Sequence, residues 1–299
     1  MRVVVTGGTG FLGRALVAAL AGRGDEAVVV TRDPSRANLP PGARGVGWDG
    51  LATAVDGANA VVNLAGETIA QRWTASAKAR IVGSRAQAAE RAGAAVRAAK
   101  SPPGVLVNAS AVGFYGNRGD EELTEESPPG SGFLAETTLA WERAAREAVP
   151  EGIRLVLLRT GVVLDPAEGA LAKMLFPFRL GLGGPLGGGA QWMPWIHRDD
   201  LLALLLAALD DPRYEGPVNG TAPGPVPMKD FAAALGRVLR RPAFAPAPAF
   251  AIRAAMGEMA ALVLDGQRAL PAKALALGFR FRFERLEPAL TDLLAPARG

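Results

Sequence analysis

Residues 2–13 read RVVVTGGTGFLG and join an apolar run to a glycine-rich turn and the start of an amphipathic segment. The run at 2–6 is apolar at consecutive positions, which is typical of a strand buried on both faces. Over 11–23 the apolar side chains recur at the spacing of a helix with one buried stripe. A second apolar run at 26–31 completes a predicted strand-helix-strand unit.

The same alternation continues through the first half of the chain. Further strands are predicted at 59–64, 105–109 and 155–158, with helices at 75–99 and 134–148 between them. Strands and helices that alternate in this way indicate an α/β fold with a doubly wound parallel sheet covered on both faces.

From about residue 165 the alternation of strands and helices becomes less regular, and this change predicts two structural units. Residues 1–165 would form the sheet domain, and 166–299 a smaller, mainly helical C-terminal lobe that carries the substrate, with segments near 195–220 returning to the sheet. Within the lobe, the loop at 181–195 is rich in glycine and holds Trp192 and Trp195. Such a loop suits a mobile lid, and its tryptophans suit either stacking on a ligand or anchoring the loop.

The glycine turn has the spacing of a dinucleotide-binding loop. Gly7 permits a tight turn, Gly10 lets the backbone approach a diphosphate, and Gly13 lets the helix pack close to the strand. Free N–H groups at the start of the helix would then face the phosphates. The alternative is a purely structural turn.

The choice of nucleotide is predicted from the end of the second strand. A basic residue there accepts the 2′-phosphate of NADP, whereas an acidic one bonds the ribose hydroxyl of NAD. The strand ends in Thr31 and Arg32, which favours NADP. Asp33 comes next, so NAD is the alternative.

Composition excludes several other classes of protein. The chain of 299 residues has no cysteine and one histidine, which argues against disulfides, thiolate chemistry and a zinc site; no metal is expected. Its net charge of +4 includes no basic run, so no nucleic-acid partner is expected. The chain starts on a strand, and its longest apolar run, at 201–209, is too short to span a bilayer. We therefore expect a cytoplasmic protein without a membrane partner.

Several strings resemble the extended short-chain dehydrogenase/reductase superfamily: TGGTGFLG at 6–13, NLAG at 63–66 and SAVGFYG at 110–116. The strings LRTGVVL at 158–164, WIHRDD at 195–200 and LDGQRALPAKALALGFRFRF at 264–283 are similar to its atypical epimerase-like group, within the NAD-dependent epimerase/dehydratase superfamily. The resemblance implies a Rossmann fold, NADP(H) binding and a small, sugar- or nucleotide-like substrate.

One feature of that superfamily is missing here. Its members carry a tyrosine and, four residues later, a lysine whose ammonium lowers the pKa of the phenol. Neither Tyr115 nor Tyr214 has a lysine at that spacing, and Leu134 and Thr138 fall at the two positions if Glu142 is aligned with the acid that follows the motif.

The resemblance also implies contacts to the cofactor. The residues that match its cofactor-binding positions are Gly7, Gly10, Phe11, Leu12 and Gly13 for the pyrophosphate, Thr31 and Arg32 for the adenosine phosphate, Leu64, Ala65 and Gly66 beside the adenine ribose, Arg85 on the long helix, and Val162 near the nicotinamide amide.

Three residues are candidates for catalysis. Ser110 matches the catalytic hydroxyl of the superfamily, Tyr115 is a displaced proton donor, and Glu67 follows a strand end, where it would act as a base or bind the nicotinamide ribose. Each has a structural alternative: local backbone bonding for Ser110, packing for Tyr115, and a pair with Arg72 for Glu67. For His197 the structural interpretation is preferred, with Asp199 capping the helix that follows.

These observations predict an NADP-dependent oxidoreductase or epimerase. The alternative is a redox-sensing regulatory protein that binds NADP without turnover, which the missing tyrosine and lysine would explain. Nothing in the sequence fixes the substrate or the oligomeric state.

Overall fold

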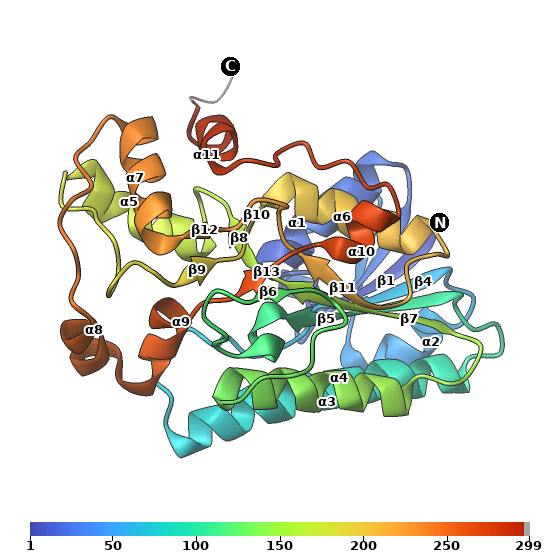
Figure 1. The fold of residues 1–299 in the computed structure, drawn as a ribbon. Helices are drawn as coiled ribbons and strands as arrows, with labels where there is room; N and C mark the ends of the chain where they lie inside the picture. The colour runs from blue at the N-terminus through green and yellow to red at the C-terminus, as the bar shows by residue number, and fades with distance from the viewer. Residues whose placement is uncertain (296–299) are drawn as a thin grey trace.

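The computed structural model, which describes residues 1–295, is built on one parallel sheet of seven strands (Figure 1). In spatial order the strands are β11 (Gly216–Gly220), β7 (Arg154–Thr160), β5 (Val105–Ala111), β4 (Ala60–Asn63), β1 (Arg2–Thr6), β2 (Glu26–Val30) and β3 (Ala43–Val46). The predicted doubly wound sheet is confirmed. Chain order reverses beside β1, which opens a crevice at the carboxyl ends of β1 and β4.

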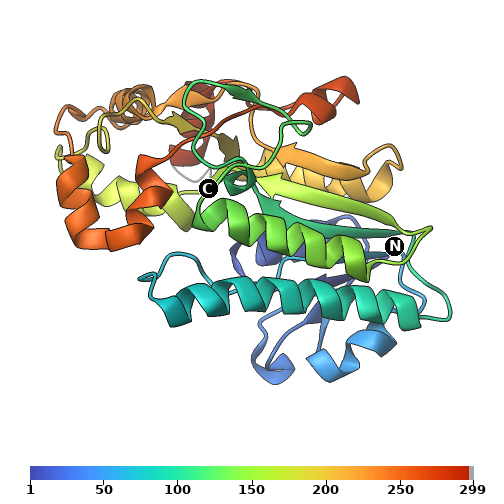
Figure 2. The ribbon, with the colours of Figure 1, turned by 60° about the horizontal axis from the view of Figure 1, so that its bottom comes forward.

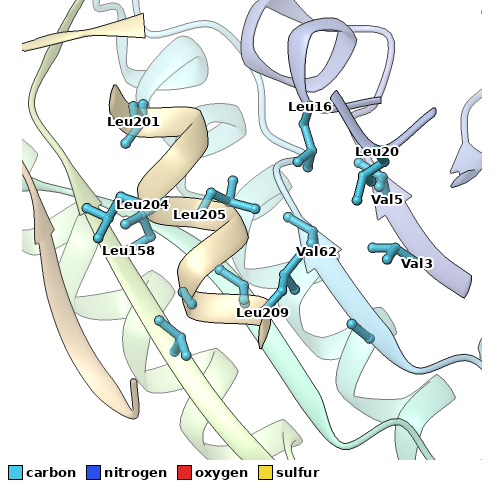
Figure 3. Close-up of a cluster of buried hydrophobic side chains, with 14 of the residues drawn as sticks. Val3, Val5, Leu16, Leu20, Val62, Leu158, Leu201, Leu204, Leu205 and Leu209 are labelled. Atoms are coloured by element: carbon cyan, nitrogen blue, oxygen red, sulfur yellow. The ribbon is translucent and has the colours of Figure 1, made fainter. Parts of the chain in front are cut away.

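Helices cover both faces of the sheet (Figure 2). One face carries α1 (Phe11–Gly22) and α6 (Arg198–Asp210), and the other carries α2 (Leu51–Val55), α3 (Ala75–Ala98) and α4 (Phe133–Ala148). Figure 3 shows the first of these cores, in which leucines of α6 lie against valines of the central strands. Its labelled members are Val3, Val5, Leu16, Leu20, Val62, Leu158, Leu201, Leu204, Leu205 and Leu209.

Residues 195–220 contribute both a helix and a strand to the sheet domain. Strand β11 pairs with β7 at one edge, and α6 packs on the sheet beside α1. The side chain of His197 caps α6, since its Nδ1 accepts a hydrogen bond of 3.0 Å from the Asp199 N–H. The expectation that Asp199 supplies this cap was wrong, because the helix begins at Arg198, before that residue.

The C-terminal lobe has its own core, around Phe231, Leu235 and Trp195. Its helices are α5 (Gly169–Arg179), α7 (Met228–Leu239), α8 (Ala249–Met256), α9 (Ala261–Leu264) and α11 (Leu286–Leu294), and its strands pair as β8 (Val162–Leu164) with β10 (Trp195–His197) and β9 (Trp192–Met193) with β12 (Val226–Pro227). The chain also returns to the sheet domain through β13 (Arg268–Ala269), which pairs with β6 (Glu122–Leu123), and through α10 (Ala272–Ala276). Within 1–295, no helix has both the length and the apolarity needed to cross a membrane.

Truncating a leucine of α6 should destabilise the sheet domain. Leu205 is fully buried, so Leu205→Ala leaves a cavity and should lower the free energy of unfolding by about 2–5 kcal/mol. The same change at Leu139 on α4, which is 46% exposed, should cost within about 0.5 kcal/mol. Urea unfolding measures both, and equal losses would contradict this assignment of the core.

Candidate functional site

The glycine turn between β1 and α1 is closed too tightly to accept side chains. Gly7 has a φ of +69°, and a Cβ there would lie 2.8 Å from the Leu64 carbonyl carbon. A Cβ at Gly13 would lie 2.2 Å from the carbonyl oxygen of Gly7. Among residues 1–295 no side chain caps α1, so the first N–H groups of this helix have no side-chain acceptor there. Such a helix start suits an anion.

A cavity of about 870 Å³ lies against this turn. It is lined by Gly7, Thr9, Gly10, Val30, Thr31, Arg32, Trp48, Leu64, Ala65, Gly66, Glu67, Thr68, Ser84, Gln87, Ala88 and Arg91. Eight residues predicted as site residues therefore meet here: Gly7, Gly10, Thr31, Arg32, Leu64, Ala65, Gly66 and Glu67. They come from the ends of β1, β2 and β4, as expected for neighbouring parallel strands.

Other predicted cofactor residues lie outside the wall of this cavity. Phe11, Leu12 and Gly13 form the first turn of α1. Arg85 lies behind the loop that follows β4, where its Nη1 donates to the carbonyls of Glu67 (2.9 Å) and Ile81 (3.0 Å). Val162 lies in β8 and donates its N–H to the Pro194 carbonyl. Cofactor contacts of these residues stay predictions.

The two residues weighed for nucleotide choice differ in their surroundings. Arg32 lines the cavity, and within residues 1–295 it makes no hydrogen bond or ion pair. The Asp33 carboxylate accepts a bond of 2.6 Å from Ser35 and lies 3.8 Å from Arg36. Because Asp33 is engaged in its own turn, the basic side chain is the one offered to a ligand.

Sequence reasoning missed part of the cavity wall. Ser84, Gln87, Ala88 and Arg91 form one stripe of α3, at the spacing of successive helical turns. That spacing was readable in the sequence. Trp48 follows β3, a short edge strand that was not predicted because its ARGV sequence lacks a continuous apolar run.

A buried polar row ties together the strand ends beneath the cavity. Thr6 Oγ1 donates to Asn63 Oδ1 (2.5 Å), and Asn63 Nδ2 donates to Asn108 Oδ1 (2.6 Å). The three residues are register neighbours on β1, β4 and β5 and are fully buried. The row fixes the ends of three strands relative to one another.

Ser110 faces α4 inside a buried network. It pairs in register with Arg159, so both side chains point to the same face of the sheet. Glu142 Oε1 accepts hydrogen bonds from Ser110 Oγ (2.7 Å) and Arg159 Nε (2.8 Å), and its Oε2 accepts from Arg159 Nη2 (2.9 Å). All three residues are at most 4% exposed.

Tyr115 belongs to the same network. It is fully buried, donates its hydroxyl proton to Asn219 Oδ1 (2.7 Å) and accepts a bond from Arg159 Nη1 (3.0 Å). Burial raises the pKa of Tyr115 to about 12, although Arg159 opposes the shift. The structure thus brings Ser110 and Tyr115 together, but not at the cavity, and their catalytic roles stay predictions that this burial does not favour.

Helix α4 carries no ionisable side chain at the two positions where the superfamily has its tyrosine and lysine. Leu134 is aliphatic, and the Thr138 hydroxyl donates to the carbonyls of Leu134 and Ala135 within its own helix. The next turn holds Glu142, which is paired with Arg159.

Glu67 is the candidate catalytic side chain that lines the cavity. Its Oε1 accepts bonds from Gln71 Nε2 (2.9 Å) and Arg80 Nε (3.1 Å). These two bonds lower the pKa of Glu67, which therefore stays ionised at neutral pH. Its partner is Arg80 rather than the expected Arg72.

The profile of the NAD dependent epimerase/dehydratase family matches residues 3–219. This chain belongs to that family. A domain of unknown function, DUF1731, matches residues 247–293, in the C-terminal lobe.

Relatives at 38–42% identity span nearly the whole of this family member. It is 42% identical to the "Epimerase family protein SDR39U1 homolog, chloroplastic" of Arabidopsis thaliana (98% of this chain, 87% of that protein). It is 39% identical to "Epimerase family protein SDR39U1" of Homo sapiens (99% and 100%). "Epimerase family protein YfhF" of Bacillus subtilis is 38% identical (99% and 98%).

Solved structures share the fold. The human epimerase family protein SDR39U1, solved with NADPH, superposes with a TM-score of 0.90 at 39% identity (98% of this chain, 99% of that one). A UDP-glucose 4-epimerase of Thermus thermophilus, solved with NAD, superposes with a TM-score of 0.74 at 21% identity (97% of each chain), which shows the fold alone.

Removing the charge of Glu142 should destabilise the protein strongly. Glu142→Gln leaves the guanidinium of Arg159 buried without a carboxylate, which should cost about 3–5 kcal/mol of unfolding free energy. Glu121→Gln removes the partner of Arg118 at the surface and should cost less than about 1 kcal/mol. Urea unfolding at pH 7 separates the two, and a small loss for Glu142→Gln would contradict the buried pair.

Tyr115 should remain protonated well into alkaline pH. In an absorbance titration of tyrosinate at 295 nm, Tyr115→Phe should remove a step near pH 12 and leave the signal below pH 10 unchanged. Tyr214, the other tyrosine, supplies the remaining step. Loss of a step at or below pH 10 would show that Tyr115 has the accessible, acidic phenol that proton transfer needs.

Proposed function

We propose that the protein binds NADP(H) in the cavity beside the glycine turn and transfers hydride between it and a small polar substrate, as an oxidoreductase or epimerase. The observation that carries this proposal is the cavity itself, which is lined both by a glycine turn closed to side chains and by Arg32, whose guanidinium has no partner among residues 1–295. The backbone cradle fits a diphosphate, and the guanidinium fits a further phosphate.

Each part of the cavity has a task in this proposal. The N–H groups at the start of α1 bind the diphosphate, and Arg32 with Thr31 binds the 2′-phosphate. Leu64 and Ala65 pack on the adenosine. The bound cofactor supplies the hydride, and the superposition with the NADPH-bound human relative supports the choice of nucleotide.

The protein side chains have different roles in handling the proton. Glu67 is ionised at neutral pH, so of the three candidates it is the one already deprotonated, and it accepts hydrogen bonds from a ribose or substrate hydroxyl. Ser110 and Tyr115 act as positioning residues, since their hydroxyls hold the network around Arg159. We propose a sugar- or nucleotide-like substrate, by likeness to the wider family.

A second candidate function is binding of NADP(H) without turnover. It is favoured by α4, where Leu134 and the internally bonded Thr138 leave no proton donor at the usual positions. Incubation with NADPH and a panel of carbonyl compounds and nucleotide sugars separates the two. Oxidation of NADPH or epimerisation supports the enzyme; tight NADPH binding with no reaction across the panel supports the binding protein.

Arg32→Ala should weaken the binding of NADPH far more than the binding of NADH. The charged contact to the 2′-phosphate should be worth about 1.5–3 kcal/mol, or roughly tenfold or more in Kd, and NADH lacks that phosphate. The control Arg36→Ala removes a side chain that is 87% exposed and outside the cavity, and should leave both affinities unchanged. Calorimetry measures the Kd of both nucleotides. An equal loss of affinity for the two would assign the contact that selects the nucleotide to Asp33 instead of Arg32.

A further inference from the structure

A second guanidinium lines the same cavity as Arg32. Arg91 comes from α3, Trp48 from the segment after β3, and Arg32 from the end of β2, yet all three line one cavity together with Thr31. These elements are distant in sequence and meet only because β2, β3 and β4 lie in one sheet. This end of the cavity is therefore assembled by the fold.

Arg91 is held in place by Trp48. Its Nη2 donates to the Trp48 carbonyl (3.2 Å), and its Cζ lies 4.5 Å from the centroid of the indole ring. A cation placed over an indole face is stabilised electrostatically and loses less freedom when a ligand arrives. The contact satisfies one N–H of a group that has five, so donors remain for a ligand.

The charges that line the cavity are unbalanced. Within the described residues, neither Arg32 nor Arg91 has a carboxylate partner. Glu67 is the one carboxylate on the described wall, and Gln71 and Arg80 already bond it. Two cations beside one cavity, with no carboxylate partner in the described part of the chain, create a positive potential that a dianion would neutralise.

We infer that Arg91, oriented by Trp48, is a specificity-determining residue that binds the 2′-phosphate together with Arg32. This inference rests on the proposed function and deepens it, since it assigns selection of NADP over NAD to a pair of arginines from different elements. A phosphate oxygen bonded by two guanidinium groups is held by charge from both sides.

The test uses two fragments that differ only in the phosphate at issue, adenosine 2′,5′-bisphosphate and 5′-AMP, with the full chain in calorimetry. Arg91→Met keeps an aliphatic stem over Trp48 and removes the charge. This variant should bind the bisphosphate about tenfold more weakly than the wild type, and 5′-AMP less than about threefold more weakly. Arg91→Lys keeps a positive charge but lacks the planar guanidinium. Its affinity for the bisphosphate should therefore lie between those of the wild type and Arg91→Met.

The matched control is Arg97→Met on the same helix. Arg97 is exposed, lies outside the cavity and donates to the carbonyls of Glu147 and Ala148, so both fragments should bind this variant like the wild type. Unchanged thermal midpoints for all variants exclude a folding defect.

The outcomes separate this inference from the proposed function. If wild type binds the bisphosphate and Arg91→Met binds it equally well, or loses both fragments equally, the inference is overturned while the nucleotide site stands. If wild type binds neither fragment nor NADPH, the proposed function itself fails. A selective loss with Arg91→Met supports both.

Discussion

The structure depends on one close approach between the first helix and the turn before it. The carbonyl of Gly7 lies where a side chain on residue 13 would have to be, at 2.2 Å from its Cβ. Because neither residue has a side chain, α1 can start directly at the carboxyl end of β1. The N–H groups of the helix are thereby brought to the crevice where the strand order reverses, and the cavity forms beside them.

Charged side chains have different surroundings in the protein interior and at the cavity. In the interior, the cation of Arg159 is matched by the carboxylate of Glu142, and Ser110 and Tyr115 satisfy further bonding positions. A buried charge requires such matching, because desolvation is otherwise too costly. At the cavity, Arg32 and Arg91 are exposed to solvent, so they need no protein partner and remain available to an anion.

The directions of individual side chains explain why the structure differs from the interpretation of the sequence. Ser110, at the end of strand β5, was expected at the site, but alternation along the strand turns its side chain toward α4 and into the pair of Glu142 and Arg159. Arg85 was predicted on the correct helix, yet its guanidinium bonds the backbone behind the loop after β4. Position along an element is thus readable from sequence, whereas a partner on another element is not.

By itself, the sequence determined the local physics: apolar runs that must be buried as strands, a helix stripe that must face them, and glycines at the three positions where the turn needs them. It also determined the absence of a tyrosine and lysine pair, since that follows from residue spacing alone. Only the tertiary structure decided which edge of the sheet the returning segment joins as β11, that Ser110 and Tyr115 share one buried network, and that Arg91 lines the same cavity as Arg32. These outcomes depend on which segments become neighbours, which is set by packing of the whole sheet and its helices rather than by any local pattern.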